Sequence, residues 1–234
     1  MLPEWFSAFF RNSASSKTDG QTLKPRASVA PKATDLLTAS DGEHLRRSSG
    51  LEQFFSHIGE QTGLNILDLS GASQANVAFI TNLGHKLYSN DFVRNLELNF
   101  GDSLYDGQVN PRHMEYFLLQ NLNYEEQQFD GVLVWDVLEY LAAPMLPPAI
   151  DQLFRMVKPG SYLFAVFHSQ ERAESVLSYS FRIQDARNLL LTPRGMRRPA
   201  QLFSNRAIEK VFQRYEYVKF FLTRENLREV IVKR

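Results

Sequence analysis

The sequence predicts an α/β fold with a mostly parallel, doubly wound sheet of seven strands and an antiparallel hairpin at the C-terminal end. Residues 65–69, 129–136 and 162–167 are short apolar runs, as expected of strands buried on both faces of a parallel sheet. Segments with helical apolar spacing lie between them, and this alternation indicates parallel strands with right-handed crossovers. Residues 217–223 and 227–232 read as two more strands that a short connection joins into the hairpin.

Length and charge limit the classes of protein to which this chain can belong. Its 234 residues allow one α/β domain and an extension, and a hydrophobic fraction of 44% is ordinary for a globular core. Lys plus Arg and Asp plus Glu both number 26, so the formal net charge is zero. We therefore expect no general nucleic-acid binding and no polybasic membrane anchor.

The chain contains no cysteine, which excludes disulfides, thiolate zinc sites and cysteine nucleophiles. A reducing compartment is permitted, and we expect a cytoplasmic protein. No apolar run is long enough to span a bilayer. The five histidines show no ligand spacing, so we predict no metal site; they are His44, His57, His85, His113 and His168.

The N-terminal region divides into two parts before the main domain at residues 48–234. Residues 1–11 form a short amphipathic segment, in which Trp5, Phe6 and Phe9 fall on one helical face. This segment either docks on the domain or contacts a partner or a membrane surface through residues 2–10. Residues 12–47 are rich in Ser, Thr, Lys, Ala and Pro, and we expect a flexible linker.

The domain begins with a pattern typical of a nucleoside-binding βαβ unit. A helix that opens with a capping box at residues 49–52 is expected to run to about Thr62. A strand ending at Asp68, a turn of small residues, a helix over 74–83 and a strand over 85–89 follow, and Asp91 lies just past the second strand. An acid about 20 residues after such a turn is placed to bind a ribose.

The second half of the domain repeats the alternation of strand and helix with two ambiguous segments. Residues 92–106 are expected to be loop with helix fragments. Residues 114–122 are expected to supply the third strand, with a helix as the alternative, because a short apolar run does not separate the two. Residues 169–203 form an insertion that reads either as a lid or substrate loop or as an irregular solvated segment. A last helix, with Asn205 as its cap, precedes the hairpin.

Two motifs resemble the class I S-adenosylmethionine-dependent methyltransferases. Residues 129–141, FDGVLVWDVLEYL, are similar to the family's fourth strand, and residues 153–160, LFRMVKPG, are similar to the turn that follows. The resemblance covers about residues 50–234. It implies a Rossmann-like fold, S-adenosylmethionine as the cofactor and S-adenosylhomocysteine as the product.

The same resemblance implies a set of cofactor-binding residues. Asp91 would accept from the ribose hydroxyls, Phe92 would lie against the adenine, and Trp135 would border the methionine end. The full implied set is Asp68, Ser70, Gly71, Ala72, Asp91, Phe92, Asn121, Leu122 and Trp135. The turn departs from the family pattern, because the positions that usually hold glycine are here Ser70, Ala72 and Gln74.

The function expected from the resemblance is methyl transfer to an unidentified acceptor. The alternative is a non-catalytic methyltransferase-like domain that serves as a binding or assembly module. A nicotinamide-dependent oxidoreductase is disfavoured because the GxGxxG turn is absent. No catalytic residue is evident; His168 is a weak candidate for a base, with a structural role as its alternative. The arginines of residues 169–203 suggest an anionic acceptor.

Overall fold

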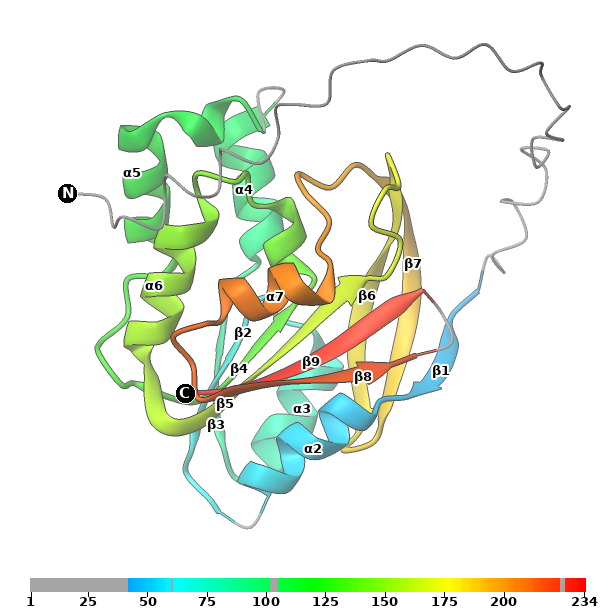
Figure 1. Ribbon diagram of the computed structural model, residues 1–234. Helices are drawn as coiled ribbons and strands as arrows, with labels where there is room; N and C mark the ends of the chain where they lie inside the picture. The colour runs from blue at the N-terminus through cyan, green and yellow to red at the C-terminus, as the bar shows by residue number, and fades with distance from the viewer. Residues whose placement is uncertain (1–41, 60, 102–104, 224–225) are drawn as a thin grey trace, which may run out of the picture. The chain divides into compact units, whose positions relative to one another are not determined.

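Two β-sheets organise the part of the chain that the structure, a computed structural model, describes: residues 42–59, 61–101, 105–223 and 226–234 (Figure 1). The larger sheet has six strands in the order β3-β2-β4-β5-β9-β8. Its strands are β2 Asn65–Asp68, β3 Lys86–Ser89, β4 Phe129–Trp135, β5 Val157–His168, β8 Tyr217–Leu222 and β9 Leu227–Lys233. The first four are parallel, whereas β9 runs antiparallel to both β5 and β8. The predicted mostly parallel sheet and its closing hairpin are confirmed.

The prediction of a third strand at residues 114–122 was wrong, and its alternative, a helix, is correct. These residues belong to helix α5, Pro111–Asn121. The Asn110 side chain accepts from the backbone N–H groups of Arg112 and His113, and Pro111 occupies the first turn, where its missing N–H costs nothing. The apolar residues Met114, Phe117 and Leu118 therefore follow helical spacing. In the described part of the chain, β3 is an edge of the larger sheet.

The insertion at 169–203 is regular over most of its length, so its reading as an irregular solvated segment was wrong. Most of it forms the hairpin of β6, Val176–Asp185, and β7, Asn188–Arg197. The Asp185 side chain accepts from the backbone N–H groups of Arg187 and Asn188 and so fixes the turn. Strand β1, His44–Arg47, pairs antiparallel with β7 to complete a second sheet in the order β1-β7-β6.

Strand β1 corrects the predicted linker, because its four residues lie inside the range 12–47 and belong to the folded domain. The rest of that range up to residue 41, and the segment 1–11, lie outside the described residues. The helix after β1 also differs slightly from the prediction. Helix α2, Ser49–Ile58, is capped by Ser48, whose side chain accepts from Leu51 N, and it ends at Gly59 rather than near Thr62.

Helices cover both faces of the larger sheet (Figure 1). Helix α2 and helix α3, Gln74–Asn82, share one apolar cluster with the second sheet on one face. Helices α4, α5, α6 and α7 pack on the opposite face. The remaining bounds are α4 Phe92–Phe100, η3 Gly107–Val109, η4 Val137–Tyr140, α6 Leu146–Met156 and α7 Asn205–Val211. The doubly wound arrangement is the one that the sequence predicted.

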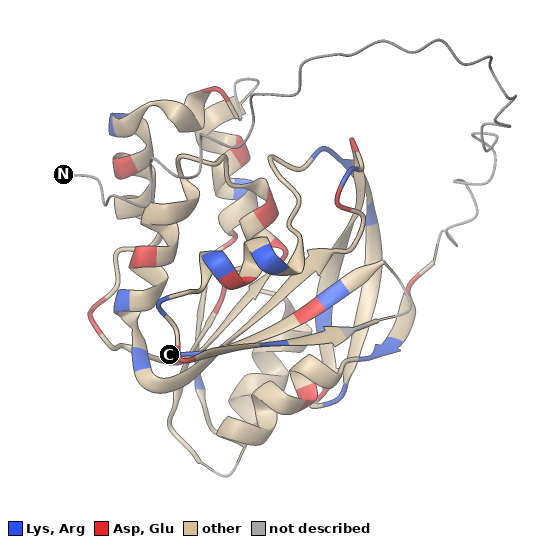
Figure 2. Cartoon of the chain, in the orientation of Figure 1, with Lys and Arg blue, Asp and Glu red and all other residues tan. Residues whose placement is uncertain are grey.

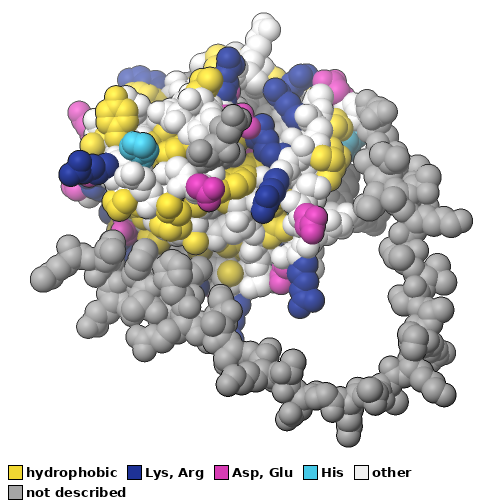
Figure 3. Space-filling model, turned by 90° about the horizontal axis from the view of Figure 1, so that it is seen from above, with side chains coloured by type: hydrophobic (Ala, Val, Ile, Leu, Met, Phe, Trp, Pro, Cys, Tyr) yellow, Lys and Arg dark blue, Asp and Glu magenta, His cyan; other side chains and the backbone are white. Residues whose placement is uncertain are grey.

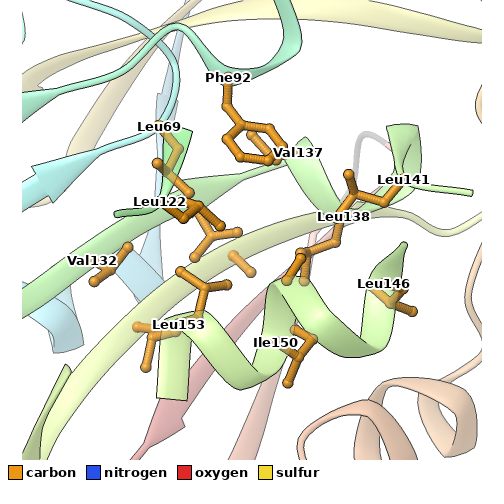
Figure 4. Close-up of a cluster of buried hydrophobic side chains, with 14 of the residues drawn as sticks. Leu69, Phe92, Leu122, Val132, Val137, Leu138, Leu141, Leu146, Ile150 and Leu153 are labelled. Carbon is orange, nitrogen blue, oxygen red and sulfur yellow. The ribbon is translucent and has the colours of Figure 1, made fainter. Parts of the chain in front are cut away.

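The apolar cluster on the α4–α7 face explains why α6 forms where it does. Leu146, Ile150 and Leu153 recur at helical spacing along α6 and point into the cluster (Figure 4). Pro147 and Pro148 lie in its first turn, which tolerates proline. Burying each such leucine or isoleucine contributes roughly 1.5–3 kcal/mol.

Charged residues of both signs are interspersed along the described elements (Figure 2). Among the described residues, no helix is both long and apolar enough to cross a bilayer.

Candidate functional site

A cleft lies at the carboxyl ends of the parallel strands, at the point where the strand order of the larger sheet reverses. The chain builds β3 on one side of β2 and β4 on the other, and such a switch point is where open α/β sheets bind ligands. The cleft has a volume of about 320 Å³. Its lining combines Ser70 after β2, Asp91 after β3, Asp136 after β4 and four residues of β6 at 178–181. Three strand ends and the added hairpin therefore enclose one site.

Asp68 holds the turn after β2 rather than facing the cleft. Its Oδ1 accepts from Ser70 N at 2.9 Å, from Ser70 Oγ at 2.8 Å and from Trp135 Nε1 at 2.7 Å. Its Oδ2 accepts from Asn76 Nδ2 at 2.8 Å. Burial raises the pKa of Asp68, while these hydrogen bonds act in the opposite direction. A fully buried carboxylate with four donors fixes the geometry of the turn.

Asn76, in the first turns of α3, joins this turn to the second sheet. Besides donating to Asp68, its side chain accepts from Ile183 N at 2.8 Å and lies 3.3 Å from the carbonyl oxygen of Phe181. The Phe181 ring stacks on the Trp135 indole, with centroids 5.0 Å apart and planes 12° apart. The hairpin wall of the cleft is thus attached to β2, α3 and β4 by buried polar and aromatic contacts.

The end of β4 has an unusual backbone that presents Asp136 to the cleft. Trp135 has a φ of 55°, in the left-handed region that bulky residues rarely adopt, and the pairing of β4 with β5 shifts register there. The indole hydrogen bond to Asp68 and the stack on Phe181 hold this conformation. Asp136 follows with φ −89° and ψ 9°, in the bridge region where many active-site residues sit. The conformation of Trp135 turns the chain so that the next carboxylate lines the cleft.

Asp136 has few donors for a carboxylate that is only 8% exposed. It precedes η4 without capping it, and its Oδ2 accepts a long hydrogen bond from Tyr140 Oη at 3.3 Å. Burial and the negative charge of Glu139 raise the pKa of Asp136 to about 6, although His168 and Tyr140 act in the opposite direction. The carboxyl group therefore changes charge near neutral pH.

Gly71 is the residue whose conformation the turn requires. Its φ is 88°, and a methyl group on its α-carbon would lie 3.0 Å from Cβ and 3.2 Å from Oδ2 of Asp91. Leu69 O accepts from Phe92 N at 3.2 Å, which draws the two strand ends together. Asp91 caps α4 through one long bond from Arg94 N, 3.4 Å, so most of its acceptor capacity faces the cleft.

Comparison with known proteins places this architecture in a family. A model described as a methyltransferase domain matches residues 43–219, which is well over half of the chain. This chain belongs to the methyltransferase-domain family. The assignment supports S-adenosylmethionine as the cofactor, as the sequence predicted. A search of curated proteins finds no match.

Several solved structures resemble this methyltransferase domain in fold. A SAM-dependent methyltransferase from Methanosarcina mazei is 15% identical, with a TM-score of 0.45, over 77% of this chain and 96% of that one. One from Archaeoglobus fulgidus is 12% identical, with a TM-score of 0.46, over 79% and 91%. The Burkholderia thailandensis 1,6-didemethyltoxoflavin-N1-methyltransferase, solved with 1,6-didemethyltoxoflavin and S-adenosylhomocysteine, is 10% identical, with a TM-score of 0.43, over 79% and 76%.

The methyltransferase domain brings together only part of the predicted cofactor set. Ser70 and Asp91 line the cleft, with Gly71 between them in the turn and Ala72 exposed beside it. Asp68 and Trp135 lie beneath the cleft and hold it in shape. Phe92 and Leu122 point into the apolar cluster (Figure 4), which leaves neither ring nor side chain free for an adenine.

Asn121 lies at the end of α5 instead of after a strand. Its Nδ2 donates to Phe117 O at 2.9 Å, and its Oδ1 accepts from Asn95 Nδ2 at 2.7 Å. Its backbone oxygen also accepts from Asn90 Nδ2 at 3.0 Å. These bonds tie α5 to α4 and to the chain after β3, so the buried Asn121 braces the region around Asp91.

His168 takes the structural alternative rather than the catalytic one. Its Nδ1 lies 2.5 Å from Glu139 Oε2, and its Nε2 lies 3.1 Å from Leu177 O. Both partners are acceptors, so both ring nitrogens carry protons. Burial alone would lower the pKa of His168, but the Glu139 hydrogen bond and charge, with help from Leu177 and Asp136, raise it. No lone pair remains for a substrate proton.

Sequence reasoning missed the roles of Asn76 and Glu139. Asn76 looked like an ordinary helix residue, because nothing in a helical pattern marks a bond to a distant strand. Glu139 stands in the recognised DVLEY motif and could have been suspected from its place at a strand end. Arg194 and Arg197 line the cleft from β7, and Arg197 also pairs with Glu97 at 3.0 Å. Basic and acidic side chains also neighbour one another on the face seen from above (Figure 3).

Proposed function

We propose that this methyltransferase domain transfers the methyl group of S-adenosylmethionine to an acceptor bound in the cleft at the ends of β2, β3 and β4. The observation that carries the proposal is the convergence of Ser70, Asp91 and Asp136 on one cleft at the switch point of the sheet. A cleft of about 320 Å³ is of the size that holds small ligands.

The side chains that line the cleft fit the cofactor chemically. Asp91 offers carboxylate oxygens to the ribose hydroxyls, and Ser70 with Gly71 lets the turn backbone approach the nucleoside. Asp136 supplies a negative charge for a cationic group. When bound, S-adenosylmethionine supplies an activated methyl group on a sulfonium, so that the protein's contribution is mainly to align the acceptor and to exclude water.

The hairpin β6–β7 is the wall on which an acceptor would lie. Arg194 and Arg197 stand on this wall, and Tyr179 and Phe181 give it apolar surface. We propose an anionic acceptor on the strength of the two guanidinium groups, which suit carboxylate or phosphate oxygens. Arg198 is outside the cleft lining. Replacing Arg194 by Glu should raise the KM for such an acceptor and leave cofactor binding unchanged, as measured by steady-state kinetics and calorimetry.

Calorimetric titration with S-adenosylmethionine and with S-adenosylhomocysteine tests the cofactor step directly. Saturable binding is expected for the natural chain, and Asp91→Asn should weaken it by at least about tenfold because a charged hydrogen-bond acceptor is lost. Asparagine still caps helices well, so α4 should persist. The exposed Asp106→Asn is the matched control. Absence of both heat and thermal shift at millimolar ligand would contradict the proposal.

That negative result would favour the second candidate, a non-catalytic binding module. One observation favours this candidate: Asp68 is fully buried, and four donors of the protein already satisfy its carboxylate. We propose separately that residues 2–10 contact a partner or a membrane surface. Crosslinking and vesicle sedimentation with and without these residues would test it, and cell fractionation would test a cytoplasmic location.

A further inference from the structure

Asp136 is the cleft residue whose cationic partner the proposed function does not name. The carboxylate is buried, lines the cleft and does not cap η4. It also lies at a backbone distortion, since Trp135 has a positive φ that Asp68 and Phe181 hold in place. Strained backbone conformations that are held by the surrounding structure are common at functional sites. The distortion before Asp136 therefore indicates that this carboxylate binds a ligand.

The position of Asp136 relative to Asp91 indicates which part of a ligand it meets. The order β3-β2-β4 places Asp91 after one neighbour of β2 and Asp136 after the other, with the Ser70 turn between them. In the proposed function, Asp91 takes the ribose hydroxyls. A cofactor held there would have the Ser70 turn and then Asp136 on its other side, so Asp136 would meet the part that carries the sulfonium.

The charges around Asp136 suit a cationic ligand. Glu139, Tyr140 and His168 surround it from η4 and the end of β5, and Glu139 and His168 already form a pair with each other. Arg197 is engaged by Glu97 and by the Tyr140 ring, 5.2 Å from its guanidinium carbon. The other charged groups in or under the cleft are Asp68, Asp91, Arg94 and Arg194. Within the described part of the chain, Arg94, Arg194 and Arg197 form no hydrogen bond or ion pair with the Asp136 carboxylate.

We propose that the Asp136 carboxylate holds the positively charged sulfonium of S-adenosylmethionine. The cleft therefore binds S-adenosylmethionine more tightly than S-adenosylhomocysteine, whose thioether sulfur is neutral. The inference rests on the proposed function. Since burial and Glu139 raise the pKa of Asp136 to about 6, the preference depends on pH. It is full when the carboxyl group is ionised and fades as the pH falls through its pKa.

Calorimetry with both ligands at two pH values tests the inference without any acceptor. At about pH 7.5, S-adenosylmethionine should bind at least roughly fivefold more tightly than S-adenosylhomocysteine, as expected for a partly desolvated charge pair. At about pH 5, only about one tenth of the carboxyl is ionised, so most of that preference should be lost. Asp136→Asn should bind both ligands equally at both pH values, and the exposed Asp106→Asn should behave like the natural chain.

A second variant keeps the test independent of how Asp136→Asn folds. Tyr140→Phe removes a hydrogen bond that lowers the pKa of Asp136, so the midpoint of the pH dependence should move upward. Equal affinity for the two ligands in the natural chain, or a preference that survives in Asp136→Asn, would overturn the inference and leave the proposed function standing. Failure of both ligands to bind would overturn the proposed function and this inference with it.

Discussion

Gly71 and Trp135 show how single residues adapt a turn whose sequence departs from the family pattern. The glycine stands at a position the pattern leaves variable, and there its conformation lets the chain close against Asp91. Trp135 adopts a positive φ although it is not a glycine, and the hydrogen bond from its indole N–H to Asp68 holds that conformation. Ser73 caps α3 and Gln74 begins it, so neither position needs glycine. The turn after β2 is therefore built by side-chain hydrogen bonds.

Replacing Gly71 by Ala tests the close approach to Asp91. We expect a loss of unfolding free energy of roughly 1–2 kcal/mol from the positive φ, and at least about 1 kcal/mol more from the contact with Asp91. Gly63→Ala is the control, because Gly63 has a φ of 74° but open space around its α-carbon. Urea unfolding of the two variants separates the costs; equal losses would show that the contact is unimportant.

The pair of His168 and Glu139 should make stability depend on pH. The folded-state pKa of His168 lies above its unfolded value, so the pair's contribution is complete below about pH 6.5 and is lost as the pH rises through the folded pKa. His168→Gln should cost roughly 1.5–3 kcal/mol at about pH 6 and less at higher pH. Urea unfolding across this range measures the difference. The exposed His113→Gln should show no such trend, and a constant cost for His168→Gln would contradict the charged pair.

Several residue roles could not be read from the sequence for a physical reason. Asp68, Ser70 and Asp91 follow strands directly, so their place near the cleft was predictable from the βαβ pattern. Phe92 and Leu122 were assigned to the cofactor by alignment alone, whereas tertiary packing buries them. The donors to a carboxylate such as Asp68 come from residues far away in the chain, and no local pattern encodes them.

At the level of elements, the added sheet β1-β7-β6 distinguishes this methyltransferase domain from the fold that the sequence predicted. The strands β2, β4, β5, β8 and β9 were predictable because their runs are apolar or clearly alternating. Strands β6 and β7 were not, because arginines interrupt their alternation and register shifts break it near Ser178 and Asp185. Strand β1, with the sequence HLRR, has one apolar residue. It forms because the edge of β7 is available to pair with it.

Asn76→Ala should loosen the attachment of this sheet to the cleft. The change leaves the Ile183 N–H and one acceptor site of Asp68 unsatisfied in a buried place, so we expect a loss of roughly 1–3 kcal/mol. Hydrogen exchange of the Ile183 amide should accelerate more than exchange in β4. Asn82→Ala, at the exposed end of the same helix, serves as control. Unchanged protection of Ile183 in Asn76→Ala would show that the hairpin is held by apolar packing alone.

At the level of the whole domain, a buried ion pair connects the two sheets. Arg46 of β1 pairs with Glu229 of β9, and Glu229 Oε2 also accepts from Gly50 N at 2.8 Å at the start of α2. The pair thus joins the second sheet, helix α2 and the antiparallel hairpin of the larger sheet. Breaking a buried pair on one side leaves an uncompensated charge, which is costly.

Arg46→Met should lower the unfolding free energy by roughly 3–5 kcal/mol, because Glu229 then lacks its counter-charge. Combining it with Glu229→Gln should recover part of the loss, since glutamine is neutral and still accepts from Gly50 N. Chemical unfolding of the two variants gives the comparison. An exposed pair, Arg214 with Asp151, is the control, and its removal should cost no more than about 1 kcal/mol. A double variant as unstable as Arg46→Met would contradict this account.

The pairing of β1 with β7 has a consequence for how the protein is made. His44 is translated well before its partner Leu191, which follows β2, β4 and β5 in the chain. Until β7 is available, β1 has no edge on which to form, and Arg46 lacks Glu229 until β9 is made. The first described strand is thus completed by strands that are made much later. A nascent chain that stalls before the β6–β7 hairpin would expose the apolar surface of α2 and α3 to chaperones.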